Sequence, residues 1–569
     1  MAEANESIPV NKGSSEDAIP LVAENEFEKA AALEGDSDVA ALPSNQLQQN
    51  AMGLVGLLFA VISCVAPMAA AVFNTAVVAG YAGATAPLEF LIGAIGLLFL
   101  IAPISYFASR LSSTAGFYTW VAHGLGKDLG YITGWLVFGA YAIFEAASQA
   151  AFGGLMDVNL STFFNVNIPG GYGWVIYALV SVLVVGGLGY LGVNASIRIM
   201  AVFSSLEILG LLIFNIAVTA HGGAAGQDFL HTFTPAGADA SLVKGIAPGG
   251  LIGMGIALTL VVFSNIGFES ASGYGEESRR PHSFIPRAMI GVLALTAVLY
   301  IWTAYSQVIG VGVDKAGSVL GNVSQAPGPF YGLAQTHVGY WFEVAIGILL
   351  TTSTWASCLA FHNVAARYLF NMAREDQIPL FSRSLGKTQE RTRSPWVASL
   401  VQTVIALLFI VFLTFIVVQT MKDGTQVYAF GIAGGAYAPA GGIGTYSWLA
   451  NIGTMTLIVV YILTAIAAPF YALKRQRESG TSEVKVFTHI VAPIVGIIVL
   501  LLPLLSLFIP FFGLGGVLEA IGFAPATFPL NILPAFFFAW LIVGIGALFY
   551  IRRSPERYQK IGHLVRIED

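Results

Sequence analysis

Long windows of apolar residues alternate with short polar segments along most of this chain. A helix of about 20 apolar residues crosses the hydrocarbon core of a bilayer, so each such window predicts one transmembrane helix. The windows begin near Met52, Leu88, Leu129, Trp174, Ile199, Leu251, Ala288, Val344, Val397, Met455, Ile490 and Ile532. We therefore predict an all-α polytopic membrane protein with twelve transmembrane helices.

The basic residues support this division of the chain. If the N-terminus is cytoplasmic, all of the 26 Lys and Arg residues except Lys244, Lys315 and Lys422 fall on the cytoplasmic side. Basic residues collect in cytoplasmic loops, and one missed span in the middle would move every later loop to the other side. The pattern predicts that both termini are cytoplasmic and that the protein is a multi-pass protein of the cell (plasma or inner) membrane.

Composition narrows the class of protein. Hydrophobic residues make up 56% of the chain and charged residues 10%, which excludes a soluble multidomain protein. Residues 1–50 are polar and rich in acids, so we predict a disordered acidic cytoplasmic tail rather than a signal peptide. A single membrane domain over residues 51–553 follows, and residues 554–569 form a cytoplasmic C-terminal tail. Cys64 and Cys358 both fall in predicted spans, where we expect neither a disulfide nor a metal site.

Two of the predicted helices carry signals for a break in mid-membrane. The first has Ala66-Pro67, and the sixth has the segment from Ser264 to Gly267. Backbone polar groups freed by a break are costly in hydrocarbon, so such breaks survive where they line an enclosed or watery cavity, as in transporters. The alternative for Pro67 is a simple kink, which transmembrane helices tolerate.

The broken helices also suggest an internal repeat. Each leads a group of five spans, residues 52–219 and residues 251–473, and two more helices at 488–551 close the chain. Because five is odd, the two groups insert with opposite topology, which is the inverted repeat of secondary transporters, with the substrate site between the breaks. The uncharged segment Gly431 to Tyr446 is predicted to be an extracellular connector, with a lid as the alternative.

Three separated motifs resemble one known family, the amino acid-polyamine-organocation transporters, which include the amino acid permeases. Residues 263–288 contain Phe-Ser-Asn-Ile-Gly-Phe-Glu-Ser, then Glu-Glu and Pro-Arg-Ala, and resemble the sixth helix of that family and its following loop. Residues 115–131 resemble the start of its third helix, and residues 363–379 the end of its eighth. The resemblance runs over nearly all of residues 52–553, which it makes a single transporter domain.

The resemblance implies a LeuT-type fold of five plus five helices, alternating access, and uptake or exchange of amino acids, polyamines or related organic cations. In this family the first break holds the substrate carboxylate and the sixth receives the amino group. The matching positions here are Ala66, Pro67, Met68, Ala69, Ala70, Phe263, Ser264, Asn265, Ile266 and Gly267, with Phe263 as the aromatic cap. Where many relatives have Gly-Ser-Gly in the first helix, this chain has Pro67, which lacks a backbone N–H, so it stays open which amides face the ligand.

Three acids lie inside predicted spans, where each needs a partner or a role. By resemblance, Glu269 couples substrate occupancy to gating; the alternative is an acid that satisfies loose backbone donors of the break. Glu145 lies on a stretch that lines the central cavity in the family, where a carboxylate suits a cationic head group, as in a basic amino acid or a polyamine. A polar contact between Glu145 and Gln149, one helical turn away, is the alternative.

Glu207 falls where some proton-coupled relatives carry a Lys near the first and eighth helices. A buried carboxylate there could bind and release a proton, so Glu207 or Glu269 is our predicted coupling group, with His362 ranked below them. Sodium ranks second to protons, with the hydroxyls of Ser353 and Thr354 as its candidate ligands.

The charged segment Glu276 to Arg287 follows the sixth helix. Its acids and bases are either solvated charges that set the topology or, by family resemblance, an inner gate. In the gate, Glu276, Glu277 and Arg287 would pair with Arg110 or Arg374.

We therefore predict a secondary active transporter, an amino acid permease, working as a symporter or antiporter for amino acids or related organic amines. Its partners are the small-molecule substrate, protons and the lipid bilayer, with no nucleic acid and no cofactor. The chain shows neither a catalytic or metal-binding motif of an enzyme nor the repeated filter of a channel. A sensor built on a transporter fold would use the same residues, and saturable uptake would distinguish the two.

Overall fold

The computed structural model describes residues 47–191, 193–224, 226–237, 254–322, 326–378, 381–420, 426–430, 438–439, 442–520 and 530–567. They belong to one compact unit, Ser44–Asp569. Most of the predicted acidic tail, residues 1–46, lies outside the described residues.

The predicted helical membrane architecture is confirmed. Within the described residues, ten helical stretches are long and apolar enough to cross a membrane, or eleven if a pair bent by 40° counts as one span. The first stretch, Leu54–Ala108, has 55 residues, more than twice the length that one crossing needs, and it contains the first two predicted windows. The count of twelve spans stays a prediction.

The long helices are α5 (Ala86–Ala108), α7 (Lys127–Phe164), α8 (Gly173–Leu191), α9 (Val193–His221), α12 (Pro281–Val311), α14 (Tyr340–Arg374), α16 (Trp396–Thr414), α17 (Gly442–Ser479), α18 (Ala492–Phe511) and α20 (Leu533–Arg552). Short helices lie between them, α6 (Gly116–Leu125), α10 (Phe229–Phe233), α13 (Gly328–His337), α15 (Ser382–Leu385) and α19 (Gly515–Ala520), and α21 (Pro555–Gln559) follows α20.

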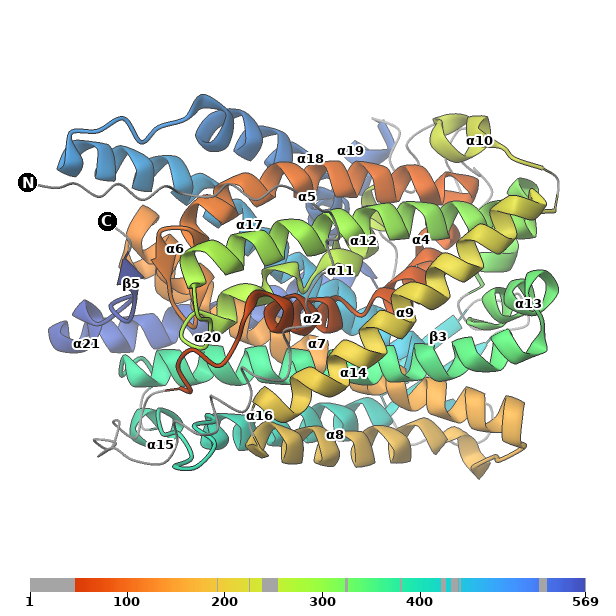
Figure 1. The fold of residues 1–569 in the computed structure, drawn as a ribbon, viewed down its shortest axis with the longest axis horizontal. Helices are drawn as coiled ribbons and strands as arrows, with labels where there is room; N and C mark the ends of the chain where they lie inside the picture. The colour runs from red at the N-terminus through yellow and green to blue at the C-terminus, as the bar shows by residue number, and fades with distance from the viewer. Residues whose placement is uncertain are drawn as a thin grey trace, which may run out of the picture. The chain divides into compact units, whose positions relative to one another are not determined.

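Helix α7 lies at the centre of the packing. It packs against α14, α17, α8 and α6, while α12 packs against α5, and α8 lies beside α16 (Figure 1). Close approach to α8 depends on a small residue, because a Cβ at Gly153 would lie 2.1 Å from the carbonyl oxygen of Trp174. Small residues at such crossings let transmembrane helices pack closely.

Both predicted helix breaks are confirmed. Helix α2 (Leu54–Val65) ends at Ala66, whose φ is +50°, and the chain continues as α3 (Pro67–Ala69), a π-helical turn (Ala70–Asn74) and α4 (Thr75–Ala82). Pro67 begins α3, where a helix needs no N–H from its first residue. Helix α11 (Met254–Asn265) ends before Gly267, whose φ is +120°, and a 3₁₀ helix (Phe268–Tyr274) follows.

Two small sheets were not predicted. Strands β2 (Ile416–Thr420), β3 (Gln426–Phe430) and β4 (Ala438–Pro439) form an antiparallel sheet between α16 and α17. Parts of the predicted connector, residues 431–437 and 440–441, lie outside the described residues. Strand β1 (Leu111–Ser112) pairs with β5 (Arg566–Ile567), which brings the C-terminal segment to the loop after α5.

Candidate functional site

A small buried cavity lies between the two helix breaks. Its wall comes from the first break, the end of α11, and helices α7, α14 and α17. The cavity has a volume of about 20 Å³, which is room for roughly one or two waters. The cavity must therefore widen before it can hold an amino acid.

Five of the ten residues predicted at the breaks line this cavity. They are Ala66, Ala69, Ala70, Phe263 and Ile266. Pro67, Met68, Ser264, Asn265 and Gly267 lie at the breaks outside the cavity wall.

Gly267 brings the two breaks into contact. Its φ of +120° favours glycine, and a Cβ there would lie 2.7 Å from the backbone nitrogen of Val65 and 2.8 Å from the carbonyl carbon of Cys64. No other residue fits both the conformation and the space. This backbone contact fixes the distance between the two walls of the cavity.

Aromatic rings form one side of the site. Phe263 packs against Phe144 at 5.2 Å and against Tyr446 at 5.6 Å between ring centroids. Phe361 and Tyr446 also line the cavity, yet sequence reasoning did not identify them. The chain has 39 Phe and 21 Tyr, so an aromatic residue in a span is no signal by itself.

A short polar chain links the two breaks to α17. The hydroxyl of Tyr446 donates to Oδ1 of Asn74 at 3.0 Å, and Nδ2 of Asn74 donates to Oγ of Ser264 at 2.8 Å. Asn265 faces the other way, because its Oδ1 accepts from Thr296 at 3.1 Å. Asn74 and Tyr446 both line the cavity, so this polar chain belongs to its wall.

The backbone amides of the first break are held by two other helices. The amide of Met68 donates to Oε2 of Glu207 on α9 at 3.4 Å, and the amide of Ala69 donates to Oγ of Ser353 on α14 at 3.3 Å. The Ser353 hydroxyl in turn donates to Oε2 of Glu207 at 2.6 Å. Glu207 thus lies beside the first break and α14, as predicted.

The structure also bears on sodium as a coupling ion. The Ser353 hydroxyl is engaged with Glu207, and the Thr354 hydroxyl donates to the carbonyl of Leu350 at 2.9 Å. These are the two hydroxyls that the sequence suggested as sodium ligands. A hydroxyl that donates its hydrogen keeps oxygen lone pairs for a cation, so these bonds do not distinguish sodium from a proton, and the coupling ion stays a prediction.

Glu269 accepts a hydrogen bond from a backbone amide of the sixth break, and it lies in the same segment as that amide. Its Oε2 accepts from the amide of Gly267 at 2.9 Å, and its Oε1 accepts from the hydroxyl of Tyr141 at 2.7 Å. The side chain is buried and outside the cavity wall. This geometry matches the alternative in which the acid satisfies loose backbone donors.

The structure places Glu145 away from the cavity wall, which corrects the predicted position. Its carboxylate lies 3.0 Å from Nδ1 of His362 and accepts from Nε2 of Gln402 at 2.7 Å, rather than contacting Gln149. Nε2 of His362 lies 2.7 Å from the hydroxyl of Ser399. Both carboxylate oxygens are thus engaged within the protein.

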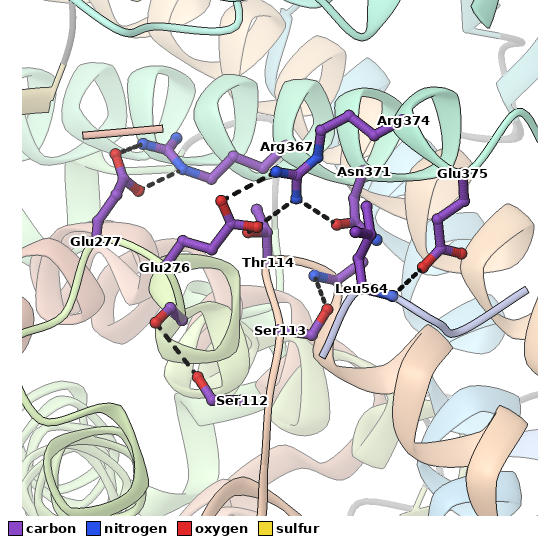
Figure 2. Close-up of polar contacts among 12 residues, drawn as sticks. Ser112, Ser113, Thr114, Glu276, Glu277, Arg367, Asn371, Arg374, Glu375 and Leu564 are labelled. Atoms are coloured by element: carbon purple, nitrogen blue, oxygen red, sulfur yellow. Dashed lines mark hydrogen bonds and ion pairs between the residues drawn. The ribbon is translucent and has the colours of Figure 1, made fainter. Parts of the chain in front are cut away.

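Four charged residues and one threonine interact after the sixth break, and we call Thr114, Glu276, Glu277, Arg367 and Arg374 the gate cluster (Figure 2). Arg367 donates twice to Glu277, both at 3.0 Å, and both side chains are buried. Glu276 accepts from Thr114 at 2.8 Å and pairs with Arg374.

Some predicted partners of this cluster differ in the structure. The pairing of Glu276 with Arg374 is confirmed, whereas Arg110 pairs with Glu483 at 2.9 Å. Arg287 lies exposed on α12. Arg367 was not predicted as a gate residue, although its position within an apolar helix was a signal for a buried partner.

Known proteins resemble this chain over the same region. A model of the amino acid permease family matches residues 56–560. The branched-chain amino acid permease BcaP of Bacillus subtilis (strain 168) is 27% identical over 344 residues, which cover 56% of this chain and 65% of that protein. BcaP of Lactococcus lactis subsp. cremoris (strain MG1363) is 22% identical, covering 58% and 70% respectively. The serine/threonine exchanger SteT of Bacillus subtilis (strain 168) is 23% identical, covering 54% and 63%.

The match therefore spans less than two thirds of the length of the first and third of these relatives. The family match itself begins in α2 and ends in the C-terminal segment, so it includes both breaks and all walls of the cavity. The family and these relatives are named as permeases or exchangers, which are transporters and not enzymes. The chain therefore belongs to the amino acid permease family of the amino acid-polyamine-organocation superfamily, whose members have the LeuT-type fold of two inverted five-helix repeats.

Proposed function

We propose that this protein is a secondary active transporter of neutral amino acids with apolar side chains. The observation that carries this proposal is the cavity wall, which contains Phe73, Phe263, Phe361 and Tyr446 and, among the described residues, no charged side chain. Apolar walls with a few placed polar groups select the shape and polarity of a ligand. Two relatives bear the name of branched-chain amino acid permeases, which supports the same substrate class.

The two breaks would hold the groups that all amino acids share. The backbone around Ala66, Ala69 and Ala70 offers polar groups for the carboxylate, and the end of α11 at Phe263 and Ile266 offers carbonyl groups for the amino group. Phe263 would close over the side chain. The wall of apolar groups leaves a cationic head group without a counter-charge, which argues against basic amino acids and polyamines.

Protons are the coupling ion in this proposal, and Glu207 is the group that carries them. Glu207 is buried, touches the first break and is bonded to α14 through Ser353, so its protonation state would affect how those elements meet. The second candidate is the buried pair of Glu145 and His362, because Ser399 connects it to a polar pocket beside Arg367.

We further propose an orientation. The gate cluster would face the cytoplasm, since basic residues collect on that side, and both termini would lie there. The twelve spans, the repeats 52–219 and 251–473 and the closing helices 488–551 belong to this proposal.

Uptake into proteoliposomes tests the substrate class. Labelled leucine, arginine and putrescine would each be offered with and without an inward proton gradient. We expect saturable leucine uptake that the gradient stimulates and that excess arginine does not inhibit. Arginine or putrescine uptake that Glu145→Gln abolishes would contradict the proposal and support a cationic substrate, and leucine binding without uptake would indicate a sensor.

Two matched variants test whether leucine binds in the cavity between the breaks. Phe263→Ala should lower the apparent affinity for leucine, because Phe263 lines the cavity. Phe549→Ala is the control, since that side chain is 61% exposed on α20. Equal effects of the two variants would place the site elsewhere.

A further inference from the structure

The C-terminal segment 554–567 returns to the end of the molecule that carries the gate cluster. It contains α21, a turn at Gly562 with φ +70°, and strand β5. Figure 2 shows the segment that carries Leu564 beside Glu375, to which the Leu564 amide donates. The segment predicted as a cytoplasmic C-terminal tail is therefore packed against the helices.

Glu375, which follows Arg374 at the end of α14, receives this segment. Its carboxylate accepts from the amide of Leu564 at 2.7 Å, from the amide of Gly562 at 2.9 Å and from the hydroxyl of Tyr118. The side chain is 2% exposed. Burial raises the pKa of Glu375, and the three donors act in the opposite direction, so the ionised carboxylate depends on them.

Further contacts attach the segment on both sides of Glu375. Arg557 pairs with Asp376 at 2.9 Å, beyond the end of α14. The carbonyl of Gly562 lies 3.1 Å from Nε2 of His123, and the carbonyl of Gln559 accepts from Lys127 at 2.7 Å. The segment thus bridges α14 to α6 and the start of α7.

The same segment is tied to the gate cluster through β1. Strand β5 pairs with Leu111–Ser112, and the Ser112 hydroxyl donates to the carbonyl of Gly275 at 3.3 Å. Thr114, two residues later, donates to Glu276, which pairs with Arg374. These contacts form a closed ring. The C-terminal segment pairs with β1, the residues after β1 contact Glu276, Glu276 pairs with Arg374 at the end of α14, and the neighbouring Glu375 binds the C-terminal segment.

We propose that residues 555–567 are a latch that holds the gate cluster closed and must release before this end of the transporter opens. The gate cannot separate the sixth-helix break from α14 while β1 and Glu375 are both fastened to one short segment. The segment is held by hydrogen bonds and by one partly exposed ion pair, Arg557 with Asp376, and its release exchanges these contacts for contacts with water. The latch is therefore an autoinhibitory contact built into the chain, and its role rests on the proposed transport function.

A reversible cross-link tests whether the latch must release. Ser112 and Arg566 are register partners in the β1–β5 pair, and Cα atoms in such pairs lie about 4.5–5.5 Å apart, within reach of a disulfide. We expect the double variant Ser112→Cys/Arg566→Cys to lose leucine uptake on oxidation and to regain it on reduction. The single variants are the controls, and uptake that persists with the cross-link complete would overturn the proposal.

A second measurement reports opening without relying on uptake. Cys64 lines the cavity and is buried, so its modification by a membrane-impermeant thiol reagent, applied from the side of the gate cluster, reports access. We expect Glu375→Gln and removal of residues 555–569 to speed that modification about tenfold. Glu556→Gln, at a side chain that is 83% exposed, is the matched control.

An unchanged rate in Glu375→Gln and in the truncated protein would reject the latch. If wild-type protein transports no amino acid while both changes still speed the modification, the proposed function fails and the latch stands. The two proposals can therefore fail separately.

Discussion

The first and sixth helix breaks both leave backbone N–H groups without helical partners, and in both a buried carboxylate accepts a hydrogen bond from such a group. At the sixth break the carboxylate belongs to Glu269, two residues after Gly267. At the first break it belongs to Glu207, which lies on α9 and is 139 residues away from Met68 in the chain.

This difference has a mechanical consequence. A carboxylate within the same segment moves with its break, so the contact of Glu269 with the Gly267 amide survives a rigid movement of the sixth helix, whereas its bond from Tyr141 on α7 would change. The contact of Glu207 joins the first break to α9 and, through Ser353, to α14, so it must change whenever those elements move apart. Alternating access needs such contacts between moving parts, and for this reason we propose Glu207 as the coupling group and Glu269 as a support of its own break.

We expect the largest loss of uptake from a substitution at Gly267, where the two breaks are in contact. Gly267→Ala places a Cβ 2.7 Å from the nitrogen of Val65 at a φ of +120°, so the two breaks must separate. We expect leucine uptake to fall about 100-fold, as for other small displacements within a site. Gly291→Ala on α12 is the control, since the nearest atom to its Cβ would be a side-chain carbon 3.8 Å away.

Glu269→Gln should reduce uptake roughly tenfold, because the hydrogen bond from Gly267 to a charged acceptor becomes one to a neutral amide. The reduction should be the same across the pH range, since this acid is a support and not the proton carrier. Uptake measured from pH 5 to 8 checks this expectation. A flattened pH profile in this variant would indicate that Glu269, and not Glu207, is the coupling group.

Ser353→Ala should weaken the link between the first break and α14, because the hydroxyl both donates to Glu207 and accepts from the Ala69 amide. We expect the accumulation ratio of leucine under a proton gradient to fall severalfold, while exchange of leucine across the membrane changes less. Thr352→Ala is the control, as that hydroxyl donates to the carbonyl of Leu349 within its own helix. Equal losses in both variants would show that Ser353 has no special part in coupling.

Tyr446→Phe should have the smallest effect. It removes one hydrogen bond to Asn74 and leaves the ring contact with Phe263 in place. A loss of about 0.5–1.5 kcal/mol for a neutral hydrogen bond corresponds to a rise in KM of roughly 2- to 10-fold. A large loss of kcat with unchanged KM would instead assign Tyr446 to the conformational step.

The parts of the fold that local signals determine could be predicted from the sequence. Pro67 and Gly267 mark the breaks because each imposes a backbone conformation on its own position, and the apolar windows identify the spans. The family resemblance placed Glu207 near the first and eighth helices, and in the structure its carboxylate contacts the first break and Ser353 on α14.

Other features depend on how helices rotate about their axes. Glu145 lies on a helix that is apolar on nearly all sides, so its sequence carried no sign of which face meets the cavity and which meets His362. Strands β1 and β5 have two residues each and lie far apart in the sequence. A strand of two residues is too short to show an alternating pattern of apolar and polar residues. The contact of the C-terminal segment with Glu375 could not be predicted either, because it uses backbone amides, which every residue type except proline provides.

Two assays of Glu207→Gln in proteoliposomes test whether Glu207 couples the proton gradient to transport. We expect the variant to exchange labelled leucine for unlabelled leucine but to accumulate none under an inward proton gradient, while Glu269→Gln keeps its accumulation in proportion to its exchange. Full gradient-driven accumulation by Glu207→Gln would show that Glu207 is not the coupling group.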